Sequence, residues 1–360
     1  MNPLHNIIAE EIDAKGPMAI SRFMALCLYH PVHGYYEAPD RSIGKDGDFY
    51  TSVSVGPVFG ELLAWRFARW LKEDCQPPWT LVEAGAHDGR LARDILASLQ
   101  EREPEILNRL RYVIIEPSAE RRRRQRRLLK EHAAVVEWLD SWDAAPRAGF
   151  NGVIFSNELL DAFPVDQFGW NARDRTWFEW RVARAEGGLS RIRGAATGRL
   201  FGALPELLNV LPDGFTIECR DAAAAWWTKA ATALQSGRLI AIDYGFEAGG
   251  AFAPARRAGT LRGYHNHRLV DDVLARPGEQ DLTSHVDFGE VSGAGEAGGL
   301  ATEALTSQTS FLTNLLAEIE AAPASFPKWN PKRLREFQTL VHPAHLGEKF
   351  KVLIQRRPSR

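Results

Sequence analysis

The chain has 360 residues, of which 45% are apolar and 25% charged, with a formal net charge of -2. These totals are typical of a soluble globular protein with one large domain or two smaller ones, and so small a net charge creates no field that would draw the molecule to nucleic acid or to an anionic membrane. The three cysteines are scattered, which excludes a disulfide framework and a CxxC zinc site, and no apolar run is long enough to insert into a membrane.

The first part of the chain is expected to be helical. Apolar residues recur through residues 3–30, with an interruption at Gly16-Pro17, and again through residues 58–72. Between them lies the polar loop 44–52 (GKDGDFYTS), a composition common in surface turns and in binding loops. The N-terminus resembles neither a signal peptide nor a good transit peptide. Together with the unpaired cysteines, this predicts a cytoplasmic protein.

Residues 81–95 (LVEAGAHDGRLARDI) predict a buried strand, a glycine turn and the start of a helix. Gly85 and Gly89 bracket the turn, where a positive φ or a close backbone approach is needed. Backbone N–H groups and the helix dipole make such a turn suitable for a nucleotide-like ligand. By itself, however, the turn is equally typical of any strand-to-helix connection.

Further buried strands are predicted over residues 112–116, 135–138, 152–155 and 238–245, with a final strand over residues 350–355. Strands that alternate with helices in this way predict an α/β protein with a doubly wound parallel sheet. The arginine run 121–127 is either a nucleic-acid patch or the solvated face of a helix, and the absence of an overall basic charge favours the helix. Residues 165–193 alternate as a β-hairpin does, residues 221–234 contain a helix, and residues 247–300 are glycine-rich and expected to be mostly loop.

Polar residues stand at the carboxyl ends of the predicted strands, where open α/β sheets bind their ligands. In chain order they are Glu83 and Gly85, Glu116, Asp140, Asn157 and Glu158, and Asp243. Glu116 is placed to accept hydrogen bonds from a ribose diol, although it could also cap a helix. The turn lacks GxGxxG, and Asp88 within it would repel a pyrophosphate. A cofactor with a sulfonium, an amino-acid end and one adenosine tolerates these acids better, which favours S-adenosylmethionine over NAD.

Several runs of residues are specific enough to indicate a family. The most specific are residues 157–164 (NELLDAFP) and 281–288 (DLTSHVDF), and others are residues 34–36 (GYY), 47–52 (GDFYTS), 243–245 (DYG) and 259–264 (GTLRGY). With these runs, which extend over nearly the whole chain, the sequence resembles the mitochondrial complex I assembly methyltransferases and their bacterial relatives. They are a branch of the class I S-adenosylmethionine-dependent methyltransferases. The chain departs from the family's usual turn, Gly-Pro-Gly-Arg-Gly-Thr, by having His87 at the middle glycine.

The resemblance implies a Rossmann-like methyltransferase sheet with an N-terminal helical segment and an inserted hairpin and helix region. Residues 1–75 are then the helical segment with a cofactor-covering loop, residues 76–164 and 237–360 the methyltransferase core, and residues 165–236 an insertion that shapes the acceptor cleft. The implied cofactor is S-adenosyl-L-methionine, and the implied partner is a protein substrate with an arginine acceptor. A homodimer remains open.

Two carboxylates, Glu158 and Asp161, are expected to be catalytic. Both could face one cleft if the chain turns helical there, and they would then hold the acceptor guanidinium and help its proton to leave. Alternatively, Glu158 binds the cofactor and Asp161 caps the following turn. The residues expected to bind the cofactor are Phe49, Thr51, Ser52, Glu83, Gly85, His87, Gly89, Glu116, Asp140 and Asn157.

No metal site is expected, because His265, His267 and His285 lack the tight spacing of metal ligands. These histidines are expected to line the acceptor cleft or to satisfy local hydrogen bonds. Two rival functions stay open. One is a nicotinamide-dependent oxidoreductase, against which the missing GxGxxG argues. The other is an assembly or binding protein that kept the fold and lost turnover, which only His87 supports.

Overall fold

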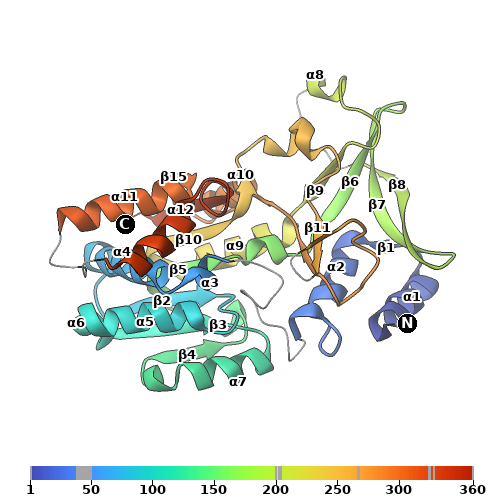
Figure 1. Ribbon diagram of the computed structural model, residues 1–360. Helices are drawn as coiled ribbons and strands as arrows, with labels where there is room; N and C mark the ends of the chain where they lie inside the picture. The colour runs from blue at the N-terminus through green and yellow to red at the C-terminus, as the bar shows by residue number, and fades with distance from the viewer. Residues whose placement is uncertain are drawn as a thin grey trace. The chain divides into compact units, whose positions relative to one another are not determined.

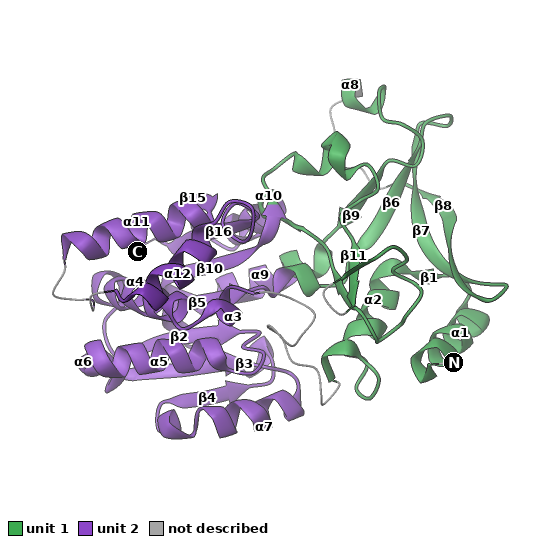
Figure 2. Cartoon of the chain, viewed as in Figure 1, with its two compact units in different colours: residues 1–49, 161–224, 246–289 green, residues 50–160, 225–245, 290–360 purple. Residues whose placement is uncertain are grey.

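A computed structural model describes residues 2–37, 51–198, 201, 205–265, 268–322, 326 and 329–358 (Figure 1). The chain divides into two compact units (Figure 2). Unit 1 consists of residues 1–49, 161–224 and 246–289, and unit 2 of residues 50–160, 225–245 and 290–360. The boundaries expected from the sequence, after residues 75, 164 and 236, do not coincide with these units and stay a prediction.

Unit 2 is built on a mostly parallel sheet with the strand order β15-β16-β10-β5-β2-β3-β4. The strands from β10 to β4 are parallel to one another, whereas β16 runs antiparallel to β10 and to β15. Their bounds are β2 (Trp79–Ala84), β3 (Leu110–Ile115), β4 (Val136–Leu139), β5 (Phe150–Asn157), β10 (Leu234–Phe246), β15 (Ala301–Ser307) and β16 (Phe350–Arg357). Every strand predicted for the sheet is therefore present, because runs of buried aliphatic residues are a strong signal for central strands.

Helices cover both faces of this sheet (Figure 1). One large apolar core joins α4, α5, α11 and α12 to the side chains of one face, among them Phe155 and Val352. Gln355 points to the opposite face, since side chains alternate along a strand, and there it accepts a hydrogen bond of 2.8 Å from Trp227 of α9. The sheet is thus doubly wound, as predicted. The helices are α3 (Ser52–Val55), α4 (Val58–Asp74), α5 (Arg90–Arg102), α6 (Pro104–Leu107), α7 (Ala119–Leu128), α9 (Asp221–Ala233), α10 (Phe288–Ala297), α11 (Gln308–Ala321) and α12 (Pro331–Val341).

Unit 1 combines α1 (Pro3–Lys15) and α2 (Ile20–Tyr29) with two antiparallel sheets. The first has the order β1-β7-β6-β9 with β8 paired to β7, and the second the order β12-β11-β13. The bounds are β1 (Met18–Ala19), β6 (Asp166–Asn171), β7 (Thr176–Ala185), β8 (Gly188–Thr197), α8 (Pro205–Leu208), β9 (Thr216–Cys219), β11 (Arg262–His265), β12 (Arg268–Val270), β13 (Asp281–Thr283) and β14 (Val286–Asp287).

The hairpin predicted within residues 165–193 is confirmed as β6, β7 and β8. The prediction of mostly loop for residues 247–300 is wrong in part, because this stretch contains the second sheet and α10. Its strands have only two to four residues each, too few for a period of two to be read from the sequence. Among the residues that the structure describes, no helix combines the length and the apolar character that crossing a membrane requires.

Candidate functional site

Four of the predicted site residues stand at or directly after the carboxyl ends of strands that lie in register in the unit 2 sheet. Ala84 of β2 pairs with Ile115 of β3 and with Ser156 of β5, and Ile115 pairs with Leu139 of β4. All four strands are parallel, so their carboxyl ends meet at the same edge. The residues that come next in the chain are Gly85, Glu116, Asn157 and Asp140, and the sheet brings them together.

The turn after β2 needs left-handed backbone at three positions. Gly85 has a φ of 73°, His87 a φ of 46° and Gly89, the N-cap of α5, a φ of 89°. A Cβ atom on Gly85 would also lie 2.8 Å from Cδ1 of Leu159. The backbone of the turn therefore comes close to the segment that follows β5, and His87 adopts the kind of backbone for which a glycine is common.

The polar side chains of the turn are held within it. Asp88 accepts a hydrogen bond of 3.1 Å from the Arg90 backbone N–H and pairs with Arg90 Nε at 2.9 Å. Burial alone would raise the pKa of Asp88, but hydrogen bonds from His87 and the Arg90 backbone lower it. Burial lowers the pKa of His87, with support from the charges of Arg121 and Arg90. Near neutral pH the turn thus carries a neutral imidazole and a carboxylate that Arg90 neutralises.

Gln125 of α7 links three of the strand ends, and the sequence analysis did not identify it. Its side chain is fully buried. Its Nε2 donates to the His87 carbonyl at 2.9 Å and to Glu116 Oε2 at 3.4 Å, and its Oε1 accepts a hydrogen bond of 2.9 Å from Trp138 Nε1. The signal that could have found it is a single uncharged residue inside the arginine run, at the one buried position of α7.

Glu116 and Glu83 are both buried, but they have different surroundings. Glu116 accepts a hydrogen bond of 3.0 Å from the Ser118 backbone and lies 4.0 Å from the Arg121 guanidinium. Glu83 accepts a hydrogen bond of 2.6 Å from the Tyr112 hydroxyl. Burial raises the pKa of Glu83 to about 8, so that it is largely protonated near neutral pH. Glu116 thus has a guanidinium group beside it, whereas the hydrogen-bond donor to Glu83 is an uncharged hydroxyl.

Glu158 stands directly after β5 and has a φ of 51°, which is uncommon for a residue with a side chain. The segment is braced by Asp243, a fully buried residue of β10. Asp243 Oδ2 accepts hydrogen bonds from the backbone N–H groups of Leu159 and Leu160 at 3.1 and 2.8 Å. The Glu158 N–H donates to the Ile242 carbonyl at 2.9 Å. These bonds hold the unusual backbone in place.

The carboxylate of Glu158 is oriented by two donors. Its Oε1 accepts hydrogen bonds from the Ser52 backbone at 3.3 Å and from Asn157 Nδ2 at 3.0 Å. Thr51 caps α3 by accepting a hydrogen bond from Ser54, and the buried Ser52 hydroxyl donates to Gln308 at 3.1 Å. The start of α3 therefore lies beside Glu158. Phe49 lies outside the described residues.

The remaining predicted residues are placed as follows. Asp161 belongs to unit 1, where it is buried and its carbonyl accepts a hydrogen bond of 2.8 Å from Ser284. The helical turn expected to align it with Glu158 begins only at Leu160. Asp140 is exposed after β4 and accepts a hydrogen bond of 3.3 Å from Ser141. Over the described ranges, no three potential metal ligands stand together, and His267 lies outside those ranges.

A ligand with donor groups fits this edge of the sheet. Asn157 Oδ1 is buried and has no hydrogen-bond partner among the described residues. Such an orphan acceptor calls for a donor, which the ammonium end of S-adenosylmethionine would supply. Gly85 and Glu116 follow neighbouring strands at this edge, and Glu116 could accept hydrogen bonds from ribose hydroxyls.

Similar proteins of known structure or name extend over nearly the whole chain. A crystal structure from Burkholderia thailandensis with bound S-adenosyl-homocysteine is 31% identical, with a TM-score of 0.80 over 98% of this chain and 92% of that one. The mitochondrial protein arginine methyltransferase NDUFAF7 homolog of Drosophila melanogaster is 27% identical over 97% of this chain and 84% of that protein. Human protein arginine methyltransferase NDUFAF7 is 25% identical over 97% of this chain and 82% of that protein.

These relatives correct the predicted location. The curated relatives from fly, fish, mouse and human are all named as mitochondrial proteins, and this comparison contradicts the prediction of a cytoplasmic protein. The prediction failed because composition and cysteine use report on folding and redox conditions, which the cytoplasm shares with other reducing compartments.

The family itself is shown by a direct match. Residues 62–306 match the model of a family described as "Putative S-adenosyl-L-methionine-dependent methyltransferase". The match includes the glycine turn, Glu116 and the segment from Asn157 to Glu158, and the related crystal structure holds the demethylated form of the same cofactor. The chain therefore belongs to this family of S-adenosyl-L-methionine-dependent methyltransferases, and S-adenosylmethionine is its cofactor.

Proposed function

We propose that this methyltransferase acts on an arginine side chain of a protein substrate. The names of the mitochondrial relatives, at 24–28% identity, support this acceptor. The observation that carries the proposal is the placement of Glu158. Its carboxylate is oriented by Ser52 and Asn157 at the carboxyl edge of the sheet, on a backbone that Asp243 braces. An anion held in this way is suited to a cationic acceptor.

The cofactor is proposed to lie along the same edge. Backbone groups of Gly85, His87 and Gly89 would contact its amino-acid end, Asn157 Oδ1 would accept from its ammonium group, and Glu116 would accept from its ribose hydroxyls. The other members of the proposed binding set are Phe49, Thr51, Ser52, Glu83 and Asp140. When bound, S-adenosylmethionine supplies an electrophilic methyl group on its sulfonium sulfur.

The acceptor must present a nitrogen lone pair in line with that methyl group. A guanidinium is a poor nucleophile, because its lone pairs are delocalised and its pKa is high. Glu158 would hold two of its N–H groups, localise the positive charge away from the attacking nitrogen and position it for in-line transfer. A carbon–nitrogen bond forms as the carbon–sulfur bond breaks, and the proton lost from the nitrogen passes to Glu158 and then to water. Asp161 is proposed as the second carboxylate.

The test is Glu158→Gln, which keeps the shape of the side chain and removes its charge. Methyl transfer to protein in a cell extract, followed with labelled cofactor, should fall by about 100-fold, since a positioned acid or base contributes at least this much. Affinity for S-adenosylhomocysteine should change less than about threefold. Glu73→Gln, which removes an exposed carboxylate at the end of α4, is the matched control.

Two results would contradict the proposal. If Glu158→Gln transfers methyl groups as fast as the parent, the carboxylate has no role in the reaction. If mass spectrometry locates the label on a residue other than arginine, the acceptor is wrong although the methyltransferase activity stands.

A further inference from the structure

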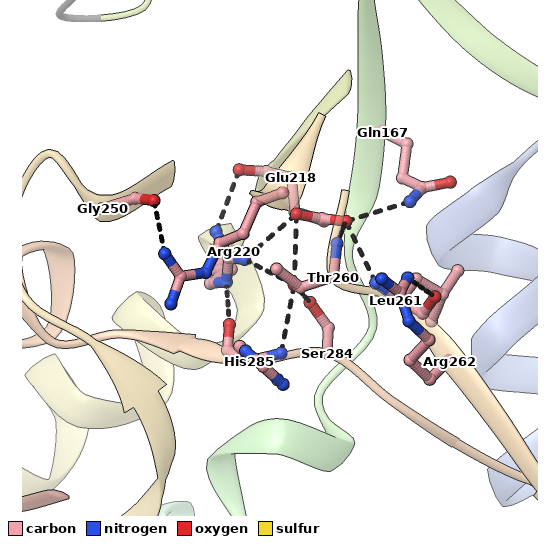
Figure 3. A network of polar contacts seen from close by, with 10 residues as sticks. Gln167, Glu218, Arg220, Gly250, Thr260, Leu261, Arg262, Ser284 and His285 are labelled. Atoms are coloured by element: carbon pink, nitrogen blue, oxygen red, sulfur yellow. Dashed lines mark hydrogen bonds and ion pairs between the residues drawn. The ribbon is translucent and has the colours of Figure 1, made fainter. Parts of the chain in front are cut away.

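A buried polar network in unit 1 is centred on Glu218 of β9 (Figure 3). Glu218 Oε1 accepts hydrogen bonds from Gln167 Nε2 at 3.0 Å and from the backbone of Thr260 and Leu261 at 2.5 and 3.1 Å. Its Oε2 accepts from Arg220 at 3.2 Å and from the Thr260 hydroxyl at 3.2 Å. Five donors thus share the one carboxylate, which has little capacity left to neutralise further cations.

Arg220 fixes the backbone at His285. Its guanidinium is almost fully buried, at 4% exposure. Besides pairing with Glu218, it donates to the His285 carbonyl at 2.7 Å and to the Thr260 hydroxyl at 3.2 Å. The His285 backbone N–H in turn donates to the Thr260 hydroxyl at 3.1 Å. Buried hydrogen bonds therefore hold both the backbone N–H and the backbone carbonyl of His285.

Two further arginines near this network have no carboxylate partner among the described residues. Arg256 donates to the Gly250 carbonyl at 2.9 Å and lies 4.6 Å from the centre of the Phe246 ring. Arg262 donates to the Leu261 carbonyl at 2.8 Å. Both side chains are half-buried. The charges of Arg220, Arg256 and Arg262 all act on His285, but within the part of the chain that the structure describes only Arg220 pairs with a carboxylate, Glu218. This leaves a positive charge that solvent only partly screens.

His285 lies within this positive field. Its Nδ1 is buried and has no hydrogen-bond partner among the described residues. Burial lowers the pKa of His285 to about 4, with the charges of Arg256, Arg220 and Arg262 acting in the same direction and Glu218 against them. The ring is therefore neutral near neutral pH, and one of its nitrogens can donate a hydrogen bond to an anion.

The same segment of chain also reaches an acidic region of unit 1. Ser284, next to His285, donates to the Asp161 carbonyl at 2.8 Å. Asp281, four residues before His285, accepts a hydrogen bond of 2.9 Å from Tyr36, and the charges of both Asp281 and Asp161 act on that tyrosine. An extended segment of four residues spans about 13 Å. The short stretch that consists of β13 and the two residues after it thus joins an acidic end to a basic end.

We propose that Arg256, Arg262 and His285 bind a carboxylate side chain of the acceptor protein, a few residues from the arginine that is methylated. The proposal rests on the proposed function, because the acidic end near Asp161 is taken to receive that arginine. Two half-buried guanidinium groups that have no carboxylate partner among the described residues, together with a buried ring nitrogen that has no hydrogen-bond partner there, are donors suited to a carboxylate. The substrate class is then a protein segment in which an arginine and an acidic residue alternate at short spacing.

The test compares two synthetic peptides that share one arginine. One has glutamates three to five residues on either side, and the other has glutamines there. Binding to the full chain, loaded with S-adenosylhomocysteine, is measured by calorimetry at low salt. The glutamate peptide should bind about tenfold more tightly, as one charge-assisted hydrogen-bonded pair allows. In Arg256→Gln and in Arg262→Gln the preference should fall below about twofold.

Arg184→Gln is the matched control, because it removes the same charge from the same unit at an arginine that pairs with Asp13. It should keep the preference. Equal binding of the two peptides to the parent, or an equal loss in the control, would overturn the proposal. A melting temperature within a few degrees of the parent shows that each variant is folded.

A second measurement reports on the site directly. The glutamate peptide should raise the pKa of His285, followed by NMR of the ring, and the glutamine peptide should leave it unchanged. An unchanged pKa of His285 with both peptides would argue against the site. Neither readout needs turnover. If the chain prefers the glutamate peptide but methylates no arginine, the anion site stands and the proposed function is refuted. If both peptides are methylated at arginine with equal KM, the proposed function stands and the anion site is refuted.

Discussion

At the scale of single residues, the site depends on backbone that few residues adopt. Gly85, His87 and Glu158 all have positive φ, at 73°, 46° and 51°. They stand at the ends of β2 and β5, which are neighbours in the sheet. Strained backbone persists only where the surroundings hold it, and it is common at functional sites. Here the Asp243 carboxylate and the Gln125 amide provide that support.

We expect Gly85→Ala to weaken the protein and its cofactor binding together. Alanine at a positive φ costs roughly 1 kcal/mol or more, and its Cβ would lie 2.8 Å from the Leu159 side chain. Gly187→Ala is the control, because its φ is 85° but no atom lies within 4 Å of the added Cβ. Denaturant unfolding and titration with S-adenosylhomocysteine measure both effects. If the two variants lose stability and affinity equally, the close approach at Gly85 has no part in either.

Glu83 gives the stability of the chain a pH dependence. Its pKa is about 8 in the folded chain and ordinarily 4.5, so folding favours the protonated form. The stability that this form contributes is fully present below about pH 4.5 and is lost as the pH rises to about 8. Glu83→Gln cannot titrate. The unfolding free energy of the parent should therefore fall, relative to this variant, between these pH values.

The measurement is urea unfolding of both proteins in the absence of cofactor, at intervals from pH 4.5 to pH 8.5. Glu137→Gln, at an exposed carboxylate paired with Arg111, should show a constant difference from the parent. A constant difference for Glu83→Gln as well would mean that Glu83 is already ionised in the folded protein.

At the scale of elements, α7 serves the site although its sequence is mostly arginine. Arg123 and Arg124 pair with Glu120, and Arg121 and Arg122 contact Glu116. Gln125 alone is buried and reaches β4 and the turn after β2. The interpretation of the arginine run as a solvated helix face agrees with this arrangement. The contacts of α7 with β4 and with the turn after β2 therefore depend on one amide group.

Gln125→Leu should remove three contacts at once and leave buried polar groups without partners. We expect a loss of roughly 2 kcal/mol in unfolding free energy and a weaker affinity for S-adenosylhomocysteine, because the His87 carbonyl loses its donor. The maximal rate with saturating cofactor should change little. Gln235→Leu, at an exposed position of β10, is the control. Loss of maximal rate at full cofactor saturation would show that Gln125 acts on more than cofactor binding.

At the scale of the whole molecule, the chain folds into two units whose segments interleave along the sequence. The glycine turn, Glu116, Asn157 and Glu158 belong to unit 2, whereas Asp161 and His285 belong to unit 1. Unit 2 is therefore proposed to bind the cofactor and unit 1 to contribute to acceptor binding.

Hydrogen exchange tests this division. S-adenosylhomocysteine should slow exchange at residues 84–90, 116–118 and 157–160, because a bound ligand stabilises the backbone that contacts it. The strands β6, β7 and β8 of unit 1 should exchange at unchanged rates. Protection in β6 to β8 equal to that at the glycine turn would contradict the division of roles.

The sequence by itself determined six strands of the unit 2 sheet, β2, β3, β4, β5, β10 and β16, and the polar residues at the ends of its parallel strands, but not the edge strand β15. Both are local properties, since a buried strand and a glycine turn are legible within about fifteen residues. The contacts that hold the site are not local. Asp243 binds the backbone 84 positions away at Leu159, and Gln125 binds His87 across 38 positions. Only the tertiary structure decides which buried donors and acceptors meet, because hydrogen bonds between distant segments depend on how the elements pack and leave no period in the sequence.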